Sequence, residues 1–237
     1  MERSDKDSAK IEAMFSSIAS RYDLLNRLLS LGRDRYWRKY AVDQLPDINN
    51  GTFLDIATGT GDISLEIAKR YPPETKVVGV DLSEKMIELG KEKVIKEGFR
   101  ERIELGTGDI NSLDFSDNYF DAAIIAFGIR NIQDYKKGIK EMARVVKDGG
   151  KIVILEFTSQ QNRLFKRPYR FYITKVLPFI SSVISGKKSA YRYLSDSVID
   201  FPPPEGLKNI MEESGLREVK YHSLTFGITT IHTGIKK

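Results

Sequence analysis

The sequence has no cysteine among its 237 residues. It therefore forms no disulfide, no thiolate zinc site and no cysteine nucleophile. Histidine is scarce too, because His222 and His232 are the only two in the chain. Two distant histidines do not make a metal site, so we expect no bound metal.

Long apolar runs are also missing. No stretch of about 18 apolar residues occurs, so we expect no membrane span. The segment Met1–Asp7 is too charged for a signal peptide, which together with the lack of cysteine favours the cytoplasm. A hydrophobic content of 41% and a charged content of 30% are typical of a soluble globular protein. The length predicts one large domain, or a domain with a small cap.

Acidic residues are absent from one long segment, between Phe157 and Ser195. This segment carries a charge of +8, so the rest of the chain sums to −3 within the net +5. It is also rich in aromatic and apolar residues. A solvated charged face, a membrane-surface contact and a nucleic-acid contact all fit this composition. Its basic residues are Arg163, Lys166, Arg167, Arg170, Lys175, Lys187, Lys188 and Arg192.

What the sequence does contain is an alternation of strand and helix patterns. Two helices, 5–30 and 36–45, precede it, with Gly32 between them. Alternating strands and helices predict an α/β fold, a mostly parallel twisted sheet with helices on both faces. The predicted strands are 52–56, 76–80, 102–106, 120–127, 151–157, 218–223 and 228–235, and the helices between them are 62–70, 84–98, 134–146 and 205–214.

A glycine turn follows the first of these strands. Phe53–Ile56 is apolar, Gly59 and Gly61 follow, and a helical pattern begins after them. Strand, glycine turn and helix together are the architecture of a nucleotide-binding crevice. The third glycine of a dinucleotide fingerprint is missing, and no P-loop motif occurs. Asp81 ends the next predicted strand and Asp109 follows the third, which places further acids at the same edge of the sheet.

The order D-x-A-x-G-T-G-D, V-x-G-x-D and G-D resembles class I S-adenosylmethionine-dependent methyltransferases. The resemblance implies a Rossmann-like fold with S-adenosylmethionine as cofactor. It also implies which residues bind that cofactor. By this resemblance, Thr58, Gly59 and Gly61 bind the methionine moiety. Asp81 binds the ribose, and Asp109 with Ile110 binds the adenine.

Four further segments resemble the ubiquinone/menaquinone biosynthesis C-methyltransferases, and the likeness runs from about Met14 to Gly234. At three positions the chain departs from these patterns. Asp34 stands where the family usually has histidine, Asp148 where it has proline, and Ala57 where many methyltransferases have glycine. Alanine is tolerated at 57 if its φ is negative. The matching segments are Tyr22–Asn26 with Ser30, Trp37 and Arg38; Phe127–Asn131; Arg144–Gly150 with Glu156–Thr158; and Tyr193, Leu194, Ser197, Phe201 and Pro202.

This narrower resemblance divides the chain into four parts within one domain. It implies a helical extension over 1–50, a cofactor-binding core over 51–158, a helical, basic and aromatic cap over 159–204, and a C-terminal helix with closing strands over 205–237.

The resemblance further implies a polyprenylated quinol as methyl acceptor. A quinol ring carbon becomes nucleophilic when a ring hydroxyl loses its proton, so the site needs a base or a cation that stabilises phenolate. Arg130 is the first candidate for that cation, and its alternative is a surface residue or a salt bridge. Asn131 contacts cofactor or acceptor, or caps a helix. Tyr22 closes over the substrate, or packs in the core.

Other candidates are weaker. Asp55 supports the cofactor or only buttresses the turn, and Arg38 forms a surface ion pair beside a packed Trp37. His232 is a second candidate base. Demethylmenaquinol is the first candidate acceptor, and the benzoquinol of ubiquinone biosynthesis is the second.

Three other functional classes stay open. They are an RNA methyltransferase, a non-catalytic nucleotide-binding or membrane-docking module and, least favoured, a Rossmann oxidoreductase. We expect peripheral contact with the inner face of a membrane and no nucleic-acid partner. The sequence leaves a homodimer open.

Overall fold

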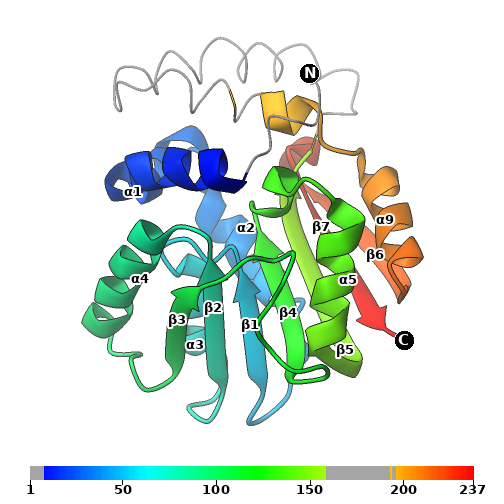
Figure 1. The fold of residues 1–237 in the computed structure, drawn as a ribbon, viewed down its shortest axis with the longest axis horizontal. Helices are drawn as coiled ribbons and strands as arrows, with labels where there is room; N and C mark the ends of the chain where they lie inside the picture. The colour runs from blue at the N-terminus through cyan, green and yellow to red at the C-terminus, as the bar shows by residue number, and fades with distance from the viewer. Residues whose placement is uncertain (1–7, 159–192, 194–195) are drawn as a thin grey trace.

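The computed structural model describes residues 8–158, 193 and 196–237. Seven strands form one sheet in the order β3-β2-β1-β4-β5-β7-β6 (Figure 1). The strands are β1 (Thr52–Ile56), β2 (Lys76–Asp81), β3 (Ile103–Thr107), β4 (Phe120–Ala126), β5 (Val146–Phe157), β6 (Leu216–Leu224) and β7 (Thr229–Lys236). The helices are α1 (Ser8–Leu29), α2 (Arg33–Val42), α3 (Asp62–Arg70), α4 (Glu84–Lys96), α5 (Tyr135–Val145) and α9 (Pro204–Glu213), with short 3₁₀ turns η2 (Ile129–Asn131) and η4 (Thr225–Gly227).

The first five strands run parallel, and β7 lies antiparallel between β5 and β6. The predicted α/β class, the parallel sheet and the two closing strands are confirmed. The strand order reverses between β1 and β4, because β2 and β3 lie on one side of β1 and β5 on the other. Ligands of open α/β sheets bind at such a switch point, beyond the carboxyl ends of the strands.

Two apolar cores flank the sheet, because successive residues of a strand face opposite sides. Phe53 and Ile124 pack with α2, α3 and α4 on one face. Leu54 and Ile125 pack with α5 and α9 on the other. All four side chains are fully buried, and burial of such a side chain stabilises the fold by about 1.5–3 kcal/mol. The strands of the sheet centre are therefore apolar on both faces.

The local signals for helix ends are confirmed. The Ser83 hydroxyl caps α4 by accepting the N–H of Met86, and Gly98 follows the helix with a φ of +80°. Gly32 separates α1 from α2 with a φ of +75°. None of the described helices is long and apolar enough to cross a bilayer.

One strand boundary differs from the prediction. Strand β5 begins at Val146 and not at residue 151, because Val146 already pairs with Phe120 of β4. The register then shifts before Ala122 pairs with Lys151. The Gly149–Gly150 pair therefore lies inside an irregular strand, where it absorbs the shift with a φ of +76° at Gly149.

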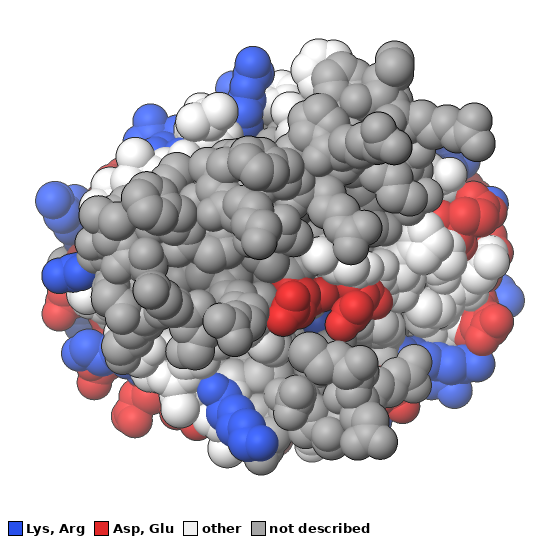
Figure 2. Space-filling model, turned by 90° about the horizontal axis from the view of Figure 1, so that it is seen from above, with Lys and Arg blue, Asp and Glu red and all other residues white. Residues whose placement is uncertain are grey.

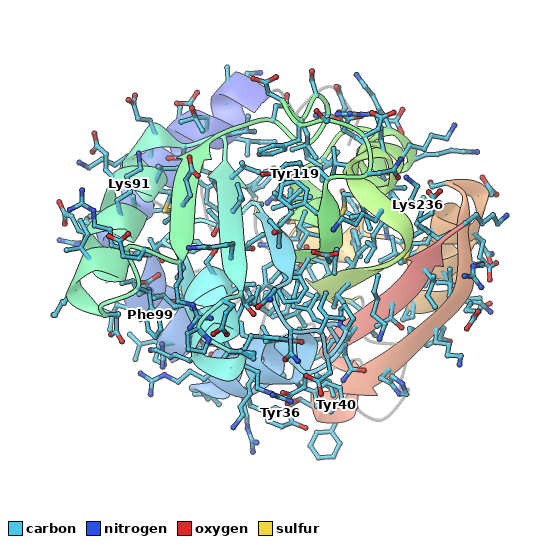
Figure 3. The ribbon with its side chains drawn as sticks, turned by 90° about the horizontal axis from the view of Figure 1, so that it is seen from below. Tyr36, Tyr40, Lys91, Phe99, Tyr119 and Lys236 are labelled. Carbon is cyan, nitrogen blue, oxygen red and sulfur yellow. The ribbon has the colours of Figure 1, made fainter. Side chains whose placement is uncertain are left out.

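Figure 3 views the molecule from below, toward the amino ends of the parallel strands. Lys236, near the end of β7, donates to the carbonyl of Val146 at 2.8 Å and to the side-chain oxygen of Asn118 at 2.6 Å. These bonds tie the end of β7 to the segments where β4 and β5 begin. At the opposite end, α1 lies across the top of the molecule in Figure 1.

The predicted cap over 159–204 and the start of the first predicted helix lie outside the described residues, apart from Tyr193 and 196–204.

Candidate active site

A pocket lies beyond the carboxyl ends of β1, β2 and β4, and its empty space of about 830 Å³ includes its opening to solvent. Beyond the strand ends of an open α/β sheet is where ligands bind. Its wall comes from α1 and from the turns after these strands and after β3. Six of the nine residues predicted for the site line it, namely Tyr22, Gly59, Asp81, Asp109, Ile110 and Asn131. Thr58, Gly61 and Arg130 do not.

The glycine turn forms one wall of this pocket. Gly59 and Gly61 have φ values of +56° and +78°, which glycine adopts without strain. The Thr58 N–H donates to the Val80 carbonyl at 3.0 Å, which anchors the turn to β2. Gly61 then provides the N-cap of α3. The turn is a rigid connection whose backbone faces the pocket.

The prediction that alanine is tolerated at position 57 required a negative φ, and Ala57 does not have one. Its φ is +53°, in the left-handed region, where a non-glycine residue is strained by about 1–2 kcal/mol. Its Cβ also explains a glycine that follows the neighbouring strand β4. A Cβ on Gly128 would lie 2.5 Å from that of Ala57, so the residue at 128 must lack a side chain. The glycine of the Phe127–Asn131 segment is therefore required by Ala57.

Asp81 joins the turn to the pocket. Its Oδ2 accepts the Gly59 N–H at 2.9 Å, and its Oδ1 accepts the Ser83 N–H at 2.9 Å. Burial raises the pKa of Asp81 above its ordinary value, against these two hydrogen bonds. A carboxylate has about four lone-pair positions, so Asp81 can still accept hydrogen bonds from two hydroxyls. This fits the ribose-binding role that the resemblance implies.

Asp109 and Ile110 form the wall that follows β3. Asp109 Oδ1 accepts both the backbone and the side-chain N–H of Asn111, at 2.9 and 2.8 Å. These bonds hold the carboxylate in place. Ile110 is buried and presents an apolar side to the pocket. A polar group beside an apolar wall suits a flat heteroaromatic ring such as adenine.

Thr58 uses its side chain beneath the pocket. Its hydroxyl donates to Asp55 Oδ2 at 2.5 Å, and that oxygen also accepts the N–H and hydroxyl of Ser64 at 3.0 and 2.7 Å. Burial raises the pKa of Asp55 to about 6, despite these three donors. Asp55 thus ties β1 to the start of α3, which is the buttressing alternative.

Helix α1 roofs the pocket. Tyr22, Phe15 and Ile11 line it from this helix, and the Tyr22 ring edge lies over Gly59. Phe15 packs against Tyr22 edge-on, with ring centroids 5.9 Å apart. Burial raises the pKa of the Tyr22 hydroxyl. The side chain therefore stays neutral at physiological pH.

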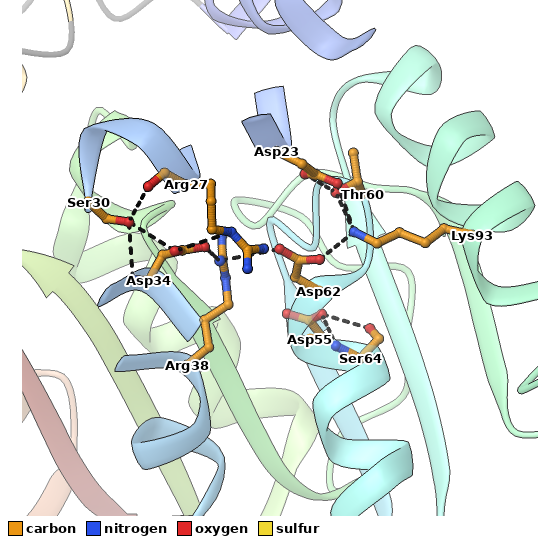
Figure 4. A network of polar contacts seen from close by, with 10 residues as sticks. All are labelled: Asp23, Arg27, Ser30, Asp34, Arg38, Asp55, Thr60, Asp62, Ser64 and Lys93. Atoms are coloured by element: carbon orange, nitrogen blue, oxygen red, sulfur yellow. Dashed lines mark hydrogen bonds and ion pairs between the residues drawn. The ribbon is translucent and has the colours of Figure 1, made fainter. Parts of the chain in front are cut away.

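An ionic cluster joins this roof to the core (Figure 4). The Lys93 ammonium on α4 lies 2.8 Å from Asp23 of α1 and also contacts Asp62 of α3. Thr60 of the glycine turn donates to Asp23 at 2.7 Å. Burial alone would raise the pKa of Asp62, but Arg38 and Lys93 hold it below its ordinary value. The cluster thus holds α1 against the two helices that flank the glycine turn.

Arg38 is buried in the same cluster, so the predicted surface ion pair is wrong. Its guanidinium lies 2.6 Å from Asp34 and 3.2 Å from Asp62. Asp34 also accepts the Ser30 hydroxyl at 2.9 Å. The Asp34 carboxylate, at the position where histidine is usual, is thus an internal counter-ion and does not line the pocket. Trp37 is packed as predicted, with its indole N–H donating to Thr225.

Arg130 forms a buried salt bridge with Glu156 at the end of β5. The two charged groups lie 2.6 Å apart, and both side chains are almost fully buried. Arg130 also donates to the Phe127 carbonyl at 2.6 Å, and Glu156 accepts the Arg130 N–H at 3.2 Å. Among the roles considered for Arg130, the salt bridge is the one that the structure contains. The pair fixes the backbone of η2, which carries Asn131 to the pocket.

Asn131 links the pocket to the one described residue within the stretch 159–195. The Tyr193 hydroxyl donates to Asn131 Oδ1 at 3.2 Å. Burial raises the pKa of Tyr193, although the Arg130 charge opposes that rise. The side chain of Asn131 is therefore oriented from outside the pocket.

The whole chain resembles known methyltransferases. Residues 3–236 match the family described as the ubiE/COQ5 methyltransferase family. The chain is 49% identical over 227 residues to "Ubiquinone/menaquinone biosynthesis C-methyltransferase UbiE" of Geotalea daltonii, covering 96% of each chain. The chain belongs to the ubiE/COQ5 methyltransferase family. It is also 43% identical over 231 residues to "Demethylmenaquinone methyltransferase" of Bacteroides fragilis, covering 98% of this chain and 94% of that one.

Solved structures share the fold. A SAM-dependent methyltransferase from Aquifex aeolicus aligns with a TM-score of 0.63 at 18% identity, over 91% of this chain and 98% of that one. The [4+2]-cyclase SpnF aligns with a TM-score of 0.72 at 14% identity, over 97% and 96%. Because one of these neighbours is named as a cyclase, the shared fold does not by itself identify a reaction. Family membership does so, and the chain is an S-adenosylmethionine-dependent methyltransferase.

The residues expected to bind this cofactor and those expected near the acceptor line different sides of the pocket. Gly59, Asp81, Asp109 and Ile110 lie on the side of β1–β3, where the resemblance puts the cofactor. Tyr22 and Asn131 lie on the roof and on the β4 side. Neither histidine lines the pocket. His232 is buried on β7, where its Nε2 lies 2.9 Å from the Pro204 carbonyl, so His232 is poorly placed as a base.

Four residues of the site region were missed or misplaced by sequence reasoning, namely Glu156, Lys93, Asp62 and Arg38. Glu156 left a signal, since it is an acid in an otherwise apolar strand end. Asp62 did so too, as an acid directly after the glycine turn. Lys93 is one of four lysines in 85–96 and has no distinguishing pattern. Its partner Asp23 is 70 residues away, so only the packing of α1 on α4 brings them together.

Proposed function

We propose that the chain transfers a methyl group to a ring carbon of a polyprenylated quinol, with demethylmenaquinol as the first acceptor. Relatives that carry the names of quinone-pathway methyltransferases match this chain over almost its whole length, which supports the acceptor class. The observation that carries the proposal is one pocket in which the cofactor residues meet Tyr22 and Asn131. Its apolar floor of Ile125, Ala126 and Phe127 suits a quinol ring.

S-adenosylmethionine supplies an activated methyl group on a sulfonium when it is bound. Transfer of that group is an in-line displacement, so alignment of the reactants supplies much of the rate, with about 7 kcal/mol available. The chain provides rigid supports for this alignment. Asp81 and the glycine turn hold one reactant, while η2, fixed by Arg130 and Glu156, places Asn131 for the other.

The acceptor must lose a hydroxyl proton for its ring carbon to attack. Arg130 is too basic to take that proton, and its guanidinium is already paired with Glu156. We therefore assign Arg130 first to positioning η2, with stabilisation of a phenolate as its second role. Tyr22 stays a candidate for closing the acceptor side, because it lines the pocket over Gly59.

The test is methyl transfer from labelled cofactor to paired naphthoquinol and benzoquinol acceptors in liposomes. We expect label on demethylmenaquinol, and loss of that label in Asp81→Ala. Label on the benzoquinol alone would replace the first acceptor by the second. No label on either quinol, in a protein that binds the cofactor, would contradict the proposal.

An RNA substrate is the competing acceptor. The basic segment that suggested it lies mostly outside the described residues. RNA binding with a steep salt dependence and a preference for sequence or structure would favour this alternative. We propose no nucleic-acid partner, because an apolar pocket floor suits a quinol better than a phosphate backbone.

We also propose that the enzyme works in the cytoplasm, at the inner face of the membrane. A water-soluble cofactor must there meet an acceptor whose prenyl chain lies in the bilayer. Fractionation of cells should divide the protein between the cytosol and salt-extractable membrane. Recovery in a detergent-only fraction would contradict this placement.

A further inference from the structure

Leucine side chains are exposed along the second half of α1 and in the turn after it. Leu24, Leu28 and Leu31 expose 54%, 45% and 85% of their surface. Leu24 and Leu28 are one helical turn apart, and Leu31 follows at the next step of three. They form an apolar stripe on the outside of the helix whose inner side roofs the pocket.

Leu31 is unfavourable in two ways at once. It is among the most exposed apolar side chains of the described residues, and its φ is +51°, in the left-handed region. The turn holds it there, because Leu31 N–H donates to the Leu28 carbonyl and Gly32 N–H to that of Arg27. Asparagine would suit this position better in both respects. A strained, solvated leucine points to a function outside the fold itself.

Basic residues are frequent in the sequence around this stripe. Between Ser20 and Tyr40 the chain has six basic and two acidic residues. Both acids are already paired, Asp23 with Lys93 and Asp34 with Arg38. Arg33 and Arg35 of α2 are exposed. Figure 2 views the molecule from above, and Lys or Arg side chains lie among uncharged ones along its upper-left edge.

We propose that this docking turn, made of Leu24, Leu28, Leu31, Arg33 and Arg35, binds the surface of an anionic lipid bilayer. Exposed leucines with a cationic border are the pattern of an interfacial anchor. The inference rests on the proposed function in one respect, that a prenylated acceptor lies in the membrane. Docking through α1 would then bring the pocket roof, with Tyr22, to the place where that acceptor enters.

A second copy of the chain fits this surface less well. A symmetric contact through the same patch would bring Arg33 and Arg35 toward their own copies, which is repulsive. RNA is also disfavoured, because leucine offers no aromatic face on which a base can stack. An anionic bilayer offers apolar contact to the leucines and negatively charged headgroups to the arginines.

The experiment measures sedimentation of the full chain with phosphatidylglycerol vesicles and with phosphatidylcholine vesicles. Each basic residue near an anionic surface contributes about fivefold to partitioning. We therefore expect Arg33→Gln with Arg35→Gln to weaken binding to phosphatidylglycerol about 25-fold. Lys140→Gln with Lys220→Gln, two exposed lysines far along the chain, is the charge-matched control and should bind like the wild type.

Leu31→Asn separates docking from folding. It should reduce vesicle binding while the melting temperature stays equal or rises, because the left-handed strain is relieved. Ile95→Gln, which changes an exposed apolar residue on α4, is the matched control and should not alter binding. Equal vesicle binding by the wild type, Leu31→Asn and the double arginine variant would overturn the proposal. So would a wild-type dimer that Leu31→Asn dissociates without any change in vesicle binding.

Turnover of a water-soluble quinol without a prenyl chain distinguishes this inference from the proposed function. The docking variants should methylate that quinol at the wild-type rate, but methylate a prenylated quinol in anionic vesicles more slowly. Equal rates of the wild type and the docking variants in those vesicles would overturn the docking role. Absence of turnover with every quinol in the wild type would contradict the proposed function, and sedimentation would still decide on docking.

Discussion

The two halves of the sheet handle charge in different ways. On the cofactor half, built on β1–β3, Asp81 lines an open pocket. Lys93, Asp23 and Asp62 keep 21–38% of their side chains exposed, beside the buried Arg38–Asp34 pair. On the proposed acceptor half, built on β4, β5 and β7, Arg130 and Glu156 are sealed from solvent. Solvated ion pairs are weak, whereas breaking a buried pair is costly. One half therefore suits the exchange of a ligand, and the other suits rigid support.

The largest effect should come from breaking the sealed pair. Arg130→Ala leaves the Glu156 carboxylate buried without its counter-ion, so we expect a loss of about 3–5 kcal/mol in the free energy of unfolding. Urea denaturation measures it. Replacement of both residues by methionine should restore most of the stability, since no charge is left buried. A loss below about 1 kcal/mol in Arg130→Ala would remove the contrast between the halves.

A fall in pH should change the contributions of His232 and Asp55, one in each half, to the free energy of unfolding in opposite directions. Burial lowers the pKa of His232 from 6.5 to about 4, so its contribution is complete above pH 6.5 and is lost as the pH falls to 4. Burial raises the pKa of Asp55 from 3.8 to about 6, so its contribution is complete below pH 3.8 and is lost as the pH rises through 6. Each shift corresponds to about 3 kcal/mol.

The variants His232→Gln and Asp55→Asn separate these two responses. Relative to the wild type, His232→Gln should gain stability as the pH falls from 6.5 to 4.5, and Asp55→Asn should lose it. Urea denaturation at each pH gives the two differences, and groups common to all three proteins cancel. Two differences of the same sign would show that the assignment of one group is wrong.

The cofactor half should lose affinity rather than stability. Asp81→Ala removes the carboxylate that accepts the Gly59 N–H and that we propose accepts hydrogen bonds from the cofactor. Hydrogen bonds to a charged group contribute about 1.5–3 kcal/mol each, so we expect cofactor binding to weaken by about 2–3 kcal/mol, or roughly 30- to 150-fold. Calorimetry with S-adenosylmethionine measures this change. Asp114→Ala, at an exposed acid, is the control, and a similar weakening in both variants would contradict the role of Asp81.

The smallest effect should come from the partly exposed cluster. Lys93→Ala frees Asp23 of α1 from α4 and should raise the dissociation constant for the cofactor about fivefold, because such pairs contribute up to about 1 kcal/mol. The difference from the wild type should shrink at high salt. Lys91→Ala, at an exposed position on the same helix, is the control. A salt-independent change would indicate that Lys93 acts through packing.

Much of the architecture could be predicted because its signals are local. Apolar periodicity located the seven strands and the six α-helices of the described residues to within a few residues, except at the start of β5, and the glycines at 59 and 61 marked the turn. The boundary that failed, at Val146, depended on a partner strand. The same distinction between local signals and distant partners holds for the side chains of the site. Asp81 and Asp109 were predictable because strand ends of a parallel sheet meet at one edge.

The sequence by itself determined the layered α/β fold, the glycine turn and the acids at its rim, since these follow from patterns within a few residues. Only the tertiary structure decided how α1 roofs the pocket, which carboxylate pairs with Arg130, and that Ala57 takes a positive φ opposite Gly128. Those features depend on groups brought together from distant positions. Their energies arise from burial and close contact, and no local pattern encodes either one.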